Sequence, residues 1–522
     1  MGALDPYSGR WDERKAAHLM RRATFVTTRA KAKELAAKTP AQAVDMLLTE
    51  KPAPPAPLDP DTNQTWVNST TPNTQDFLYR PRVKSWWFEM MLKPDDLNIT
   101  EKLTLCWHNH FATESDVVND SRFQYFHNQT LRRNCMGNFK EFVRQITIDN
   151  GMLRYLNGDQ NTNTRPNENY ARELQELFTI GKGKEIAPYD YTTYTEDDIR
   201  AAAKVLTGWR TPRVGDPSKS TFNAAQHDTR DKQFSKNYGN TVIKGRSGAT
   251  AGADELNDLL TMIFAQQATA KYIVRKLYRW FVHYEITQQT EDTVIAPLAA
   301  QFAQGNYEIK PVLRTLLLSE HFYDEQNIGA MIMSPLDFVA GFINKFGFQL
   351  PAVLADRYTT LQYFATLAAA MQQNIMDPPS VAGWTAYHQE PDYYRQWMNS
   401  ATLPLRYNLT DASVIGGGRY PRAFIINTLD YCEKVCANPS SAKQLVNDVA
   451  DDLCTAYPLT QDERDYLLTN TLLVGGATEA LWTAAWGAYK ANPTNATAKK
   501  TVEDRTKLLF VNLFRLAEFH LM

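Results

Sequence analysis

Amphipathic helical segments with recognisable ends recur along most of the 522-residue chain. In these segments apolar side chains return every three or four positions, which places them on one helix face that must be buried. Thr195 with Asp198, and Asn98 with Glu101, have the spacing of a capping box at a helix start. Alternation typical of strands occurs only within 222–242, where short runs surround Gly and Asn turns. The pattern predicts a mainly α fold: a large multi-helix single domain with a small β-hairpin insertion.

The strongest helical segments lie in all parts of the chain. They are expected at residues 14–24, 40–48, 82–92, 99–112, 195–208, 253–266, 268–283, 311–318, 335–345, 360–373, 421–435, 441–456, 461–473 and 501–521. Two stretches have a loop composition instead: 51–76 is an expected surface loop, and 214–250 is an expected hairpin and loop insertion. Residues 399–420 are a candidate seam before the last helices. Because no linker is polar enough to separate domains, we expect one domain over 1–522.

Composition excludes several classes of protein. The net charge is −2 with both signs dispersed, so no nucleic-acid partner is expected. No run of about 18 apolar residues occurs, so no transmembrane segment is expected. Residues 1–6 have neither the charged nor the apolar region of a signal peptide. With 43% hydrophobic residues, the chain is expected to fold around a sizeable core.

The five cysteines form no CxxC pair; they are Cys106, Cys135, Cys432, Cys436 and Cys454. Two interpretations stay open for the last three: a disulfide between two of them, or three buried free thiols.

Residues 165–181 concentrate carboxylates and an arginine in one short helix. Glu168, Arg172 and Glu176 follow one another at spacings of four on its polar side. Glu173 lies on the border with the apolar face, where a carboxylate can be partly desolvated. The arrangement is typical either of a functional site or of a solvated ladder of ion pairs.

Two histidines in the run Trp107-His-Asn-His-Phe-Ala-Thr113 are the main candidates for proton transfer. On a helix, His108 and His110 point about 200° apart, so both bind one metal only if the helix unwinds. We expect one to face a site and the other to be a hydrogen-bonded core residue.

Two further features have a functional and a structural interpretation. His227 and Asp228 form a candidate dyad, or a turn in which the aspartate caps its own backbone. Trp384 follows a Pro-Pro pair and a glycine; it is either a platform for a sugar ring or peptide, or a core residue.

Together these segments resemble the DUF1800 family, a group of bacterial proteins of unknown function. The residues that carry the resemblance are Ala17–Phe25, Trp107–Thr113, Arg165–Gly181, His227–Phe234, Pro378–Trp384 and Leu513–His520. Val26 and Ser380 depart from the family pattern, which usually has glycine and asparagine there, and neither change removes a candidate acid, base or ligand. Many family members look exported, so the resemblance implies an exported, trimmed mature chain; a cytoplasmic location stays open.

The sequence lacks the GxSxG elbow, the P-loop, the GxGxxG turn, HExxH and paired CxxC motifs. We therefore expect the histidine helix, the 165–181 helix and the 227–228 turn to converge on one polar centre, with His108 or His110 within a side chain's reach of a glutamate. The candidate catalytic residues are His108, His110, Glu168, Arg172, Glu173, Glu176, His227 and Asp228, the candidate substrate-binding residues are Arg172 and Trp384, and the candidate metal ligands are His108, His110 and Glu173.

The predicted function is that of an exported hydrolase-like enzyme. Glu173 would be the base or a ligand, and His108 or His110 the proton carrier or second ligand. Arg172 would anchor an anionic group. A divalent metal is a candidate cofactor, and a polymer such as a glycan is a candidate substrate. The alternative is a non-enzymatic exported scaffold or binding protein, in which the same residues form a buried ion-pair network.

Overall fold

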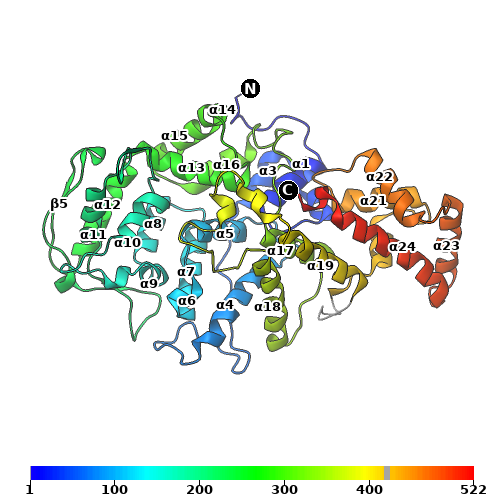
Figure 1. The fold of residues 1–522 in the computed structure, drawn as a ribbon, viewed down its shortest axis with the longest axis horizontal. Helices are drawn as coiled ribbons and strands as arrows, with labels where there is room; N and C mark the ends of the chain where they lie inside the picture. The colour runs from blue at the N-terminus through cyan, green and yellow to red at the C-terminus, as the bar shows by residue number, and fades with distance from the viewer. Residues whose placement is uncertain (1, 417–423) are drawn as a thin grey trace.

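Helices dominate the computed structural model, which describes residues 2–416 and 424–522 (Figure 1). The first half contains α1 (Glu13–Ala23), α2 (Arg29–Ala36), α3 (Pro40–Leu47), α4 (Asp76–Met91), α5 (Thr100–His110), α6 (Ser115–Val118), α7 (Ser121–Asn134), α8 (Phe139–Thr147), α9 (Asn150–Tyr155), α10 (Glu168–Glu173), α11 (Glu196–Val205) and α12 (Ala251–Phe264). The second half contains α13 (Gln267–Phe281), α14 (Gln288–Thr290), α15 (Ala296–Gln304), α16 (Ile309–Leu318), α17 (Pro335–Phe346), α18 (Leu354–Ala370), α19 (Thr402–Ile415), α20 (Thr428–Val435), α21 (Ala442–Leu453), α22 (Gln461–Leu467), α23 (Glu479–Ala491) and α24 (Ala496–Arg515). The predicted mainly α class is confirmed.

Short helical turns of other types interrupt or extend these helices. The π-helical segments are η2 (Leu174–Phe178), η5 (Glu291–Ile295) and η9 (Leu468–Leu472), and the 3₁₀ turns are η1 (Gly158–Gln160), η3 (Ala224–Gln226), η4 (Lys236–Tyr238), η6 (Thr385–Tyr387), η7 (Tyr393–Trp397) and η10 (Ala517–His520). The expected helix at 461–473 is thus an α-helix that widens into a π turn.

In the described ranges the strands form three short antiparallel pairs. They are β1 (Glu185–Ala187) with β2 (Asp190–Tyr191), β3 (Trp209–Arg210) with β4 (Thr221–Phe222), and β5 (Lys232–Gln233) with β6 (Val242–Ile243). The expected hairpin corresponds to β5–β6, but His227 precedes it, between η3 and β5. The expectation that strands are confined to 222–242 is wrong, because strands of two or three residues are too short to show alternation in the sequence.

Local capping explains some of the helix starts and corrects one. Thr195 and Asp198 form the predicted capping box of α11. Asn98 instead accepts a hydrogen bond from the Thr100 amide at 2.9 Å, so the box predicted at α5 is wrong. Its presumed partner, Glu101, is held by Arg132 at 2.8 Å. A tertiary ion pair has replaced the local cap.

The sequence did not reveal several helices, among them α7 and α8. Helix α7 is rich in polar residues, yet most of its side chains are buried. A polar helix shows no apolar stripe, so its burial depends on partners elsewhere in the chain. The expected helix at 421–435 begins at Thr428 in the described part, and residues 421–423 lie outside the described residues. The candidate seam at 399–420 contains α19, and its residues 417–420 lie outside them too.

The helices are arranged around a central group that includes α4, α5, α7, α17 and α18 (Figure 1). Helices α8–α12 lie to the left of this group in the view, and α21–α24 lie to the right. The chain end returns to the centre, where the Met522 amide donates to the Met331 carbonyl at 2.8 Å. Arg21 on α1 also donates to the Leu521 carbonyl at 2.9 Å. The last residues of the chain are therefore held by contacts with α1 and with residue 331, which lie far away in the sequence.

The described part of the chain contains neither a helix that could span a membrane nor a disulfide bond. None of its helices combines the length and apolar character needed to cross a membrane. All five cysteines are buried free thiols, which is the second of the two interpretations left open by the sequence.

The loop at 377–384 packs tightly against the end of α5. The Trp384 amide donates to Asn109 Oδ1 at 2.8 Å, and the Ser115 amide donates to Asp377 Oδ1 at 2.7 Å. Gly383 has φ +91°, and a Cβ there would lie 2.4 Å from the Asn109 carbonyl oxygen. Only glycine allows both the backbone conformation and the close approach.

We expect Gly383→Ala to lower the free energy of unfolding by about 2–5 kcal/mol, because backbone strain and overpacking add. Gly475→Ala is the matched control, since Gly475 has φ +75° but open space around it. It should lose only about 1 kcal/mol from strain. Thermal unfolding of both variants measures the difference, and equal Tm values would contradict the proposed close packing.

Candidate functional site

Three sequence motifs meet near the carboxyl end of α5. His110 Nε2 donates to the Phe178 carbonyl at 3.0 Å, which joins α5 to η2. The 377–384 loop lies against Asn109 on the same helix. Between α10 and η2 the helix changes from α to π, a feature that is frequent at functional sites. The contacts thus bring together segments that lie far apart in the sequence.

Glu173, the last residue of α10, has the most unusual carboxyl group of this region. Burial, and then the charge of Glu176, raise its pKa to about 7. Among the residues that the structure describes, none forms a hydrogen bond or ion pair with its side chain. A half-buried carboxyl that titrates near neutrality can both accept and donate a proton there.

Tyr155 is the polar group that links Glu173 to neighbouring segments. Its hydroxyl donates to Glu114 Oε1 at 2.9 Å. Burial raises the pKa of Tyr155, and so do the charges of Glu114, Glu173 and Asp377. These four half-buried side chains define what we call the Glu173 site. The sequence did not single out Glu114, Tyr155 or Asp377; the proximity of Glu114 to the histidine motif was the only signal.

Arg172, the neighbour of Glu173 in the chain, is already paired with other carboxylates. Its two terminal nitrogens contact the two Glu196 oxygens at 2.5 and 2.8 Å, and Glu168 lies at 3.5 Å. The Arg172 charge holds the pKa of Glu196 below its ordinary value. Glu176 accepts the Tyr194 hydroxyl at 2.7 Å. The ladder therefore ties α10 to α11 and lines an open surface hollow of about 500 Å³.

His108 and His110 point to opposite sides of α5, as helical geometry predicts. His110 packs among aromatic rings, including Phe178 at 6.0 Å between ring centres. His108 faces Trp87, His127 and Trp384, at 5.3, 6.1 and 6.0 Å. Burial lowers the pKa of both histidines well below the ordinary value, so both are neutral near pH 7. The described contacts of the two rings include no glutamate.

His127 on α7 is a buried histidine that the sequence did not reveal. Its Nδ1 lies 2.8 Å from Asp149 and its Nε2 lies 3.1 Å from the Phe111 carbonyl. Each of the two ring nitrogens thus lies within hydrogen-bonding distance of an oxygen atom. Asp149 also caps α9 through the Met152 amide at 3.0 Å. His127 therefore belongs to a paired structural link between α7 and α9.

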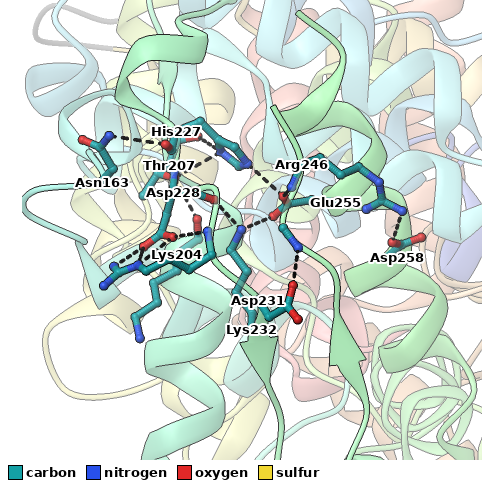
Figure 2. A network of polar contacts seen from close by, with 12 residues as sticks. Asn163, Lys204, Thr207, His227, Asp228, Asp231, Lys232, Arg246, Glu255 and Asp258 are labelled. Atoms are coloured by element: carbon teal, nitrogen blue, oxygen red, sulfur yellow. Dashed lines mark hydrogen bonds and ion pairs between the residues drawn. The ribbon is translucent and has the colours of Figure 1, made fainter. Parts of the chain in front are cut away.

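His227 and Asp228 lie in a separate, closed network (Figure 2). His227 Nε2 lies 3.1 Å from Glu255 Oε1, and Lys232 Nζ lies 2.5 Å from Glu255 Oε2. All three of these side chains have no exposed surface. His227 Nδ1 also lies 3.0 Å from the Thr207 carbonyl. Charges buried to this degree must be paired, and these are.

The expected convergence of all three segments is therefore wrong for the 227–228 turn. The turn packs beside Thr207, just after the end of α11, whereas Arg172 pairs with Glu196 at the start of that helix. The length of α11 separates them. The sequence could not show this, because a compact fold can bury several polar groups in separate places when each has its own partners.

Two other expectations can be compared with the geometry. Trp384 is only 1% exposed, so its interpretation as an open platform is wrong; it packs against α5 as core. Within the described ranges, no three His, Cys, Asp or Glu side chains are placed to hold one metal ion. His108, His110 and Glu173 accordingly do not form a ligand set.

The comparisons with known proteins agree with the motif resemblance. A family model described as "Protein of unknown function (DUF1800)" matches residues 18–494, which is most of the chain. No curated protein and no solved structure matches this sequence. The matched range contains the α5 end, α10 and the 377–384 loop, whose contacts form the Glu173 site. The chain belongs to the DUF1800 family.

Proposed function

We propose that this protein is a hydrolase-like enzyme that uses Glu173 as a general base. The observation that carries the proposal is the Glu173 carboxyl itself, which is half-buried, unpaired among the described residues, and has a pKa of about 7. A structural carboxylate gains most from a cation or several amide donors. Among the described residues Glu173 pairs directly with neither, and burial together with the Glu176 charge outweighs the opposite effect of the Arg172 and Lys182 charges. Groups held in this way are found most often at functional sites.

The neighbouring groups suggest how the site would work. Ionised Glu173 would take a proton from a water molecule as the water oxygen bonds to the substrate. The bond from the substrate to its leaving group would then break, and protonated Glu173 would return the proton to that group. Tyr155 keeps its proton, because burial and three carboxylates raise its pKa, and its hydroxyl is oriented by Glu114. It would position the substrate or the attacking water. His110 acts through packing, since its ring holds the Phe178 carbonyl of η2.

The charges of the site favour a neutral substrate. Glu114 and Glu173 would repel an anionic group, whereas the charge of Asp377 is already paired with Lys84. Arg172 is held by Glu196 instead of being free to anchor an anion. A glycan, which offers uncharged hydroxyl groups, is compatible with this balance. Export of the mature chain remains part of the proposal through the family resemblance alone.

The scaffold function is a second candidate, favoured by the His227 network. The centre of this network, formed by His227, Lys232 and Glu255, has no exposed side-chain surface, and Lys232 pairs with Glu255, which is typical of a structural element. The two candidates therefore depend on different residues. The Glu173 site supports an enzyme, and the His227 network supports a role in holding α11, α12 and the β5–β6 hairpin together.

We expect Glu173→Gln to lower the rate constant about 10²–10⁴-fold on any substrate that wild type hydrolyses. The wild-type rate should rise as pH increases through about 7, because the base must be ionised. A panel of p-nitrophenyl glycosides and esters provides the assay. Glu168→Gln, on the same helix, is the matched control and should keep its activity. An active Glu173→Gln variant with an unchanged pH profile would overturn the assignment.

The raised pKa also predicts a pH dependence of stability. Because the folded-state pKa of about 7 exceeds the ordinary 4.5, folding favours protonated Glu173, and this contribution is full below pH 4.5 and lost as pH rises through 7. Glutamine cannot ionise. We therefore expect Glu173→Gln to match wild type at pH 4.5 and to be more stable at pH 8, by about 1–2 kcal/mol after solvent screening. Tm values across this pH range measure the difference; parallel curves would contradict it.

For the structural network we expect Lys232→Met to cost about 3–5 kcal/mol, because Glu255 would keep a buried, uncompensated charge. Lys244→Met is the matched control on the same hairpin. Lys244 pairs with Asp231 at 2.7 Å but is mostly exposed, so its loss should cost less than about 1 kcal/mol. Chemical denaturation compares the two variants. Similar losses would mean that the buried pair has no special structural role.

A further inference from the structure

A small enclosed cavity lies between α5 and α7, on the side of α5 that His108 faces. Its apolar walls include Trp87, Leu131 and Met376, and its polar walls include His108, Gln124 and Asn128. It is separate from the His227 network, and no function proposed above uses it.

The polar walls of the cavity carry an unusual number of unpartnered atoms. They are Nδ1 and Nε2 of His108, Oε1 and Nε2 of Gln124, and Nδ2 of Asn128. All are inaccessible to solvent, and none has a hydrogen-bond partner among the described residues. A buried polar atom without a partner costs a protein its full desolvation penalty. Five such atoms around one cavity point to a ligand that pairs with several of them.

The size of the cavity limits the ligand to about one water molecule. The centre of a water-sized sphere can move within about 10 Å³, which is close to the least volume in which a protein holds one water. Neither a metabolite nor a hydrated ion fits this space.

The chemistry of the walls selects water over a bare ion. Gln124 offers a donor and an acceptor, Asn128 offers a donor, and neutral His108 offers one of each. An anion could use only the donors and would leave Gln124 Oε1 and one His108 nitrogen unpaired. A cation would face the two amide NH₂ groups, which can only donate hydrogen bonds. Water donates two hydrogen bonds and accepts two, which matches both kinds of group.

We propose that this cavity is a binding site for one internal water molecule, which hydrogen-bonds His108 on α5 to Gln124 and Asn128 on α7. His108 is accordingly an internal hydrogen-bonding residue and has no part in acid–base chemistry. The inference is independent of the Glu173 site.

A crystal structure at about 1.8 Å resolution provides the direct test. We expect one density peak at hydrogen-bonding distance from a His108 ring nitrogen and from Gln124 or Asn128. An anomalous signal after bromide soaking would identify an anion site and overturn the proposal. Amide rotamers that pair directly with His108, with no peak between them, would also overturn it.

The sign of a stability change gives a second test. If the water is present, Gln124→Met removes two of its partners and should lower Tm. If no ligand binds, the same change removes two unpartnered atoms and should leave Tm unchanged or raise it. Gln129→Met is the matched control on the same helix, because Gln129 is buried, its Nε2 is unpartnered, and it does not line the cavity. A Tm for Gln124→Met equal to or above that of Gln129→Met would overturn the proposal.

Discussion

The burial of α5 is the constraint on which the rest of the structure depends. Nearly every residue of this helix is buried, although seven of its eleven residues are polar or charged. The charged side chains among them must find partners inside the protein, because an unpaired buried charge is strongly destabilising. Lys102 pairs with Asp337 on α17, and Glu101 pairs with Arg132 on α7. Asn109 holds the 377–384 loop. The polar residues of one helix thus position three other parts of the fold.

The same constraint separates two kinds of polar centre. The charges of Lys232 and Glu255 are fully buried and paired with one another, beside the His227 ring, so proton transfer there would disrupt the pairing. The Glu173 side chain, by contrast, is half-buried, and among the described residues no cation forms an ion pair with it. The first arrangement holds helices together and the second is suited to chemistry. A protein of this size can contain both, because the length of α11 keeps them apart.

The Glu173 site and the His108 cavity are neighbours along the chain but differ in character. Thr113 lines the cavity and the next residue, Glu114, accepts the Tyr155 hydroxyl of the site. The segment after α5 therefore borders the enclosed cavity through Thr113 and the half-buried Glu173 site through Glu114. Well-ordered packing around the cavity would hold the Glu114 carboxylate in place, as the residues that support an active site must do. The histidine motif would thus support the proposed chemistry by helping to position Glu114, and neither histidine needs to react.

The sequence by itself determined most of the helices, because helical period and capping depend on residues only three or four positions apart. The box of Thr195 and Asp198 forms as expected, and His108 and His110 diverge by simple geometry. The tertiary structure decided the burial of α7, the separation of His227 from the other candidates, and the members of the Glu173 site. These depend on contacts such as Asn109 with Trp384, which lie 275 positions apart. No local pattern encodes such a contact, since partners for buried polar groups are chosen by the packing of the whole chain.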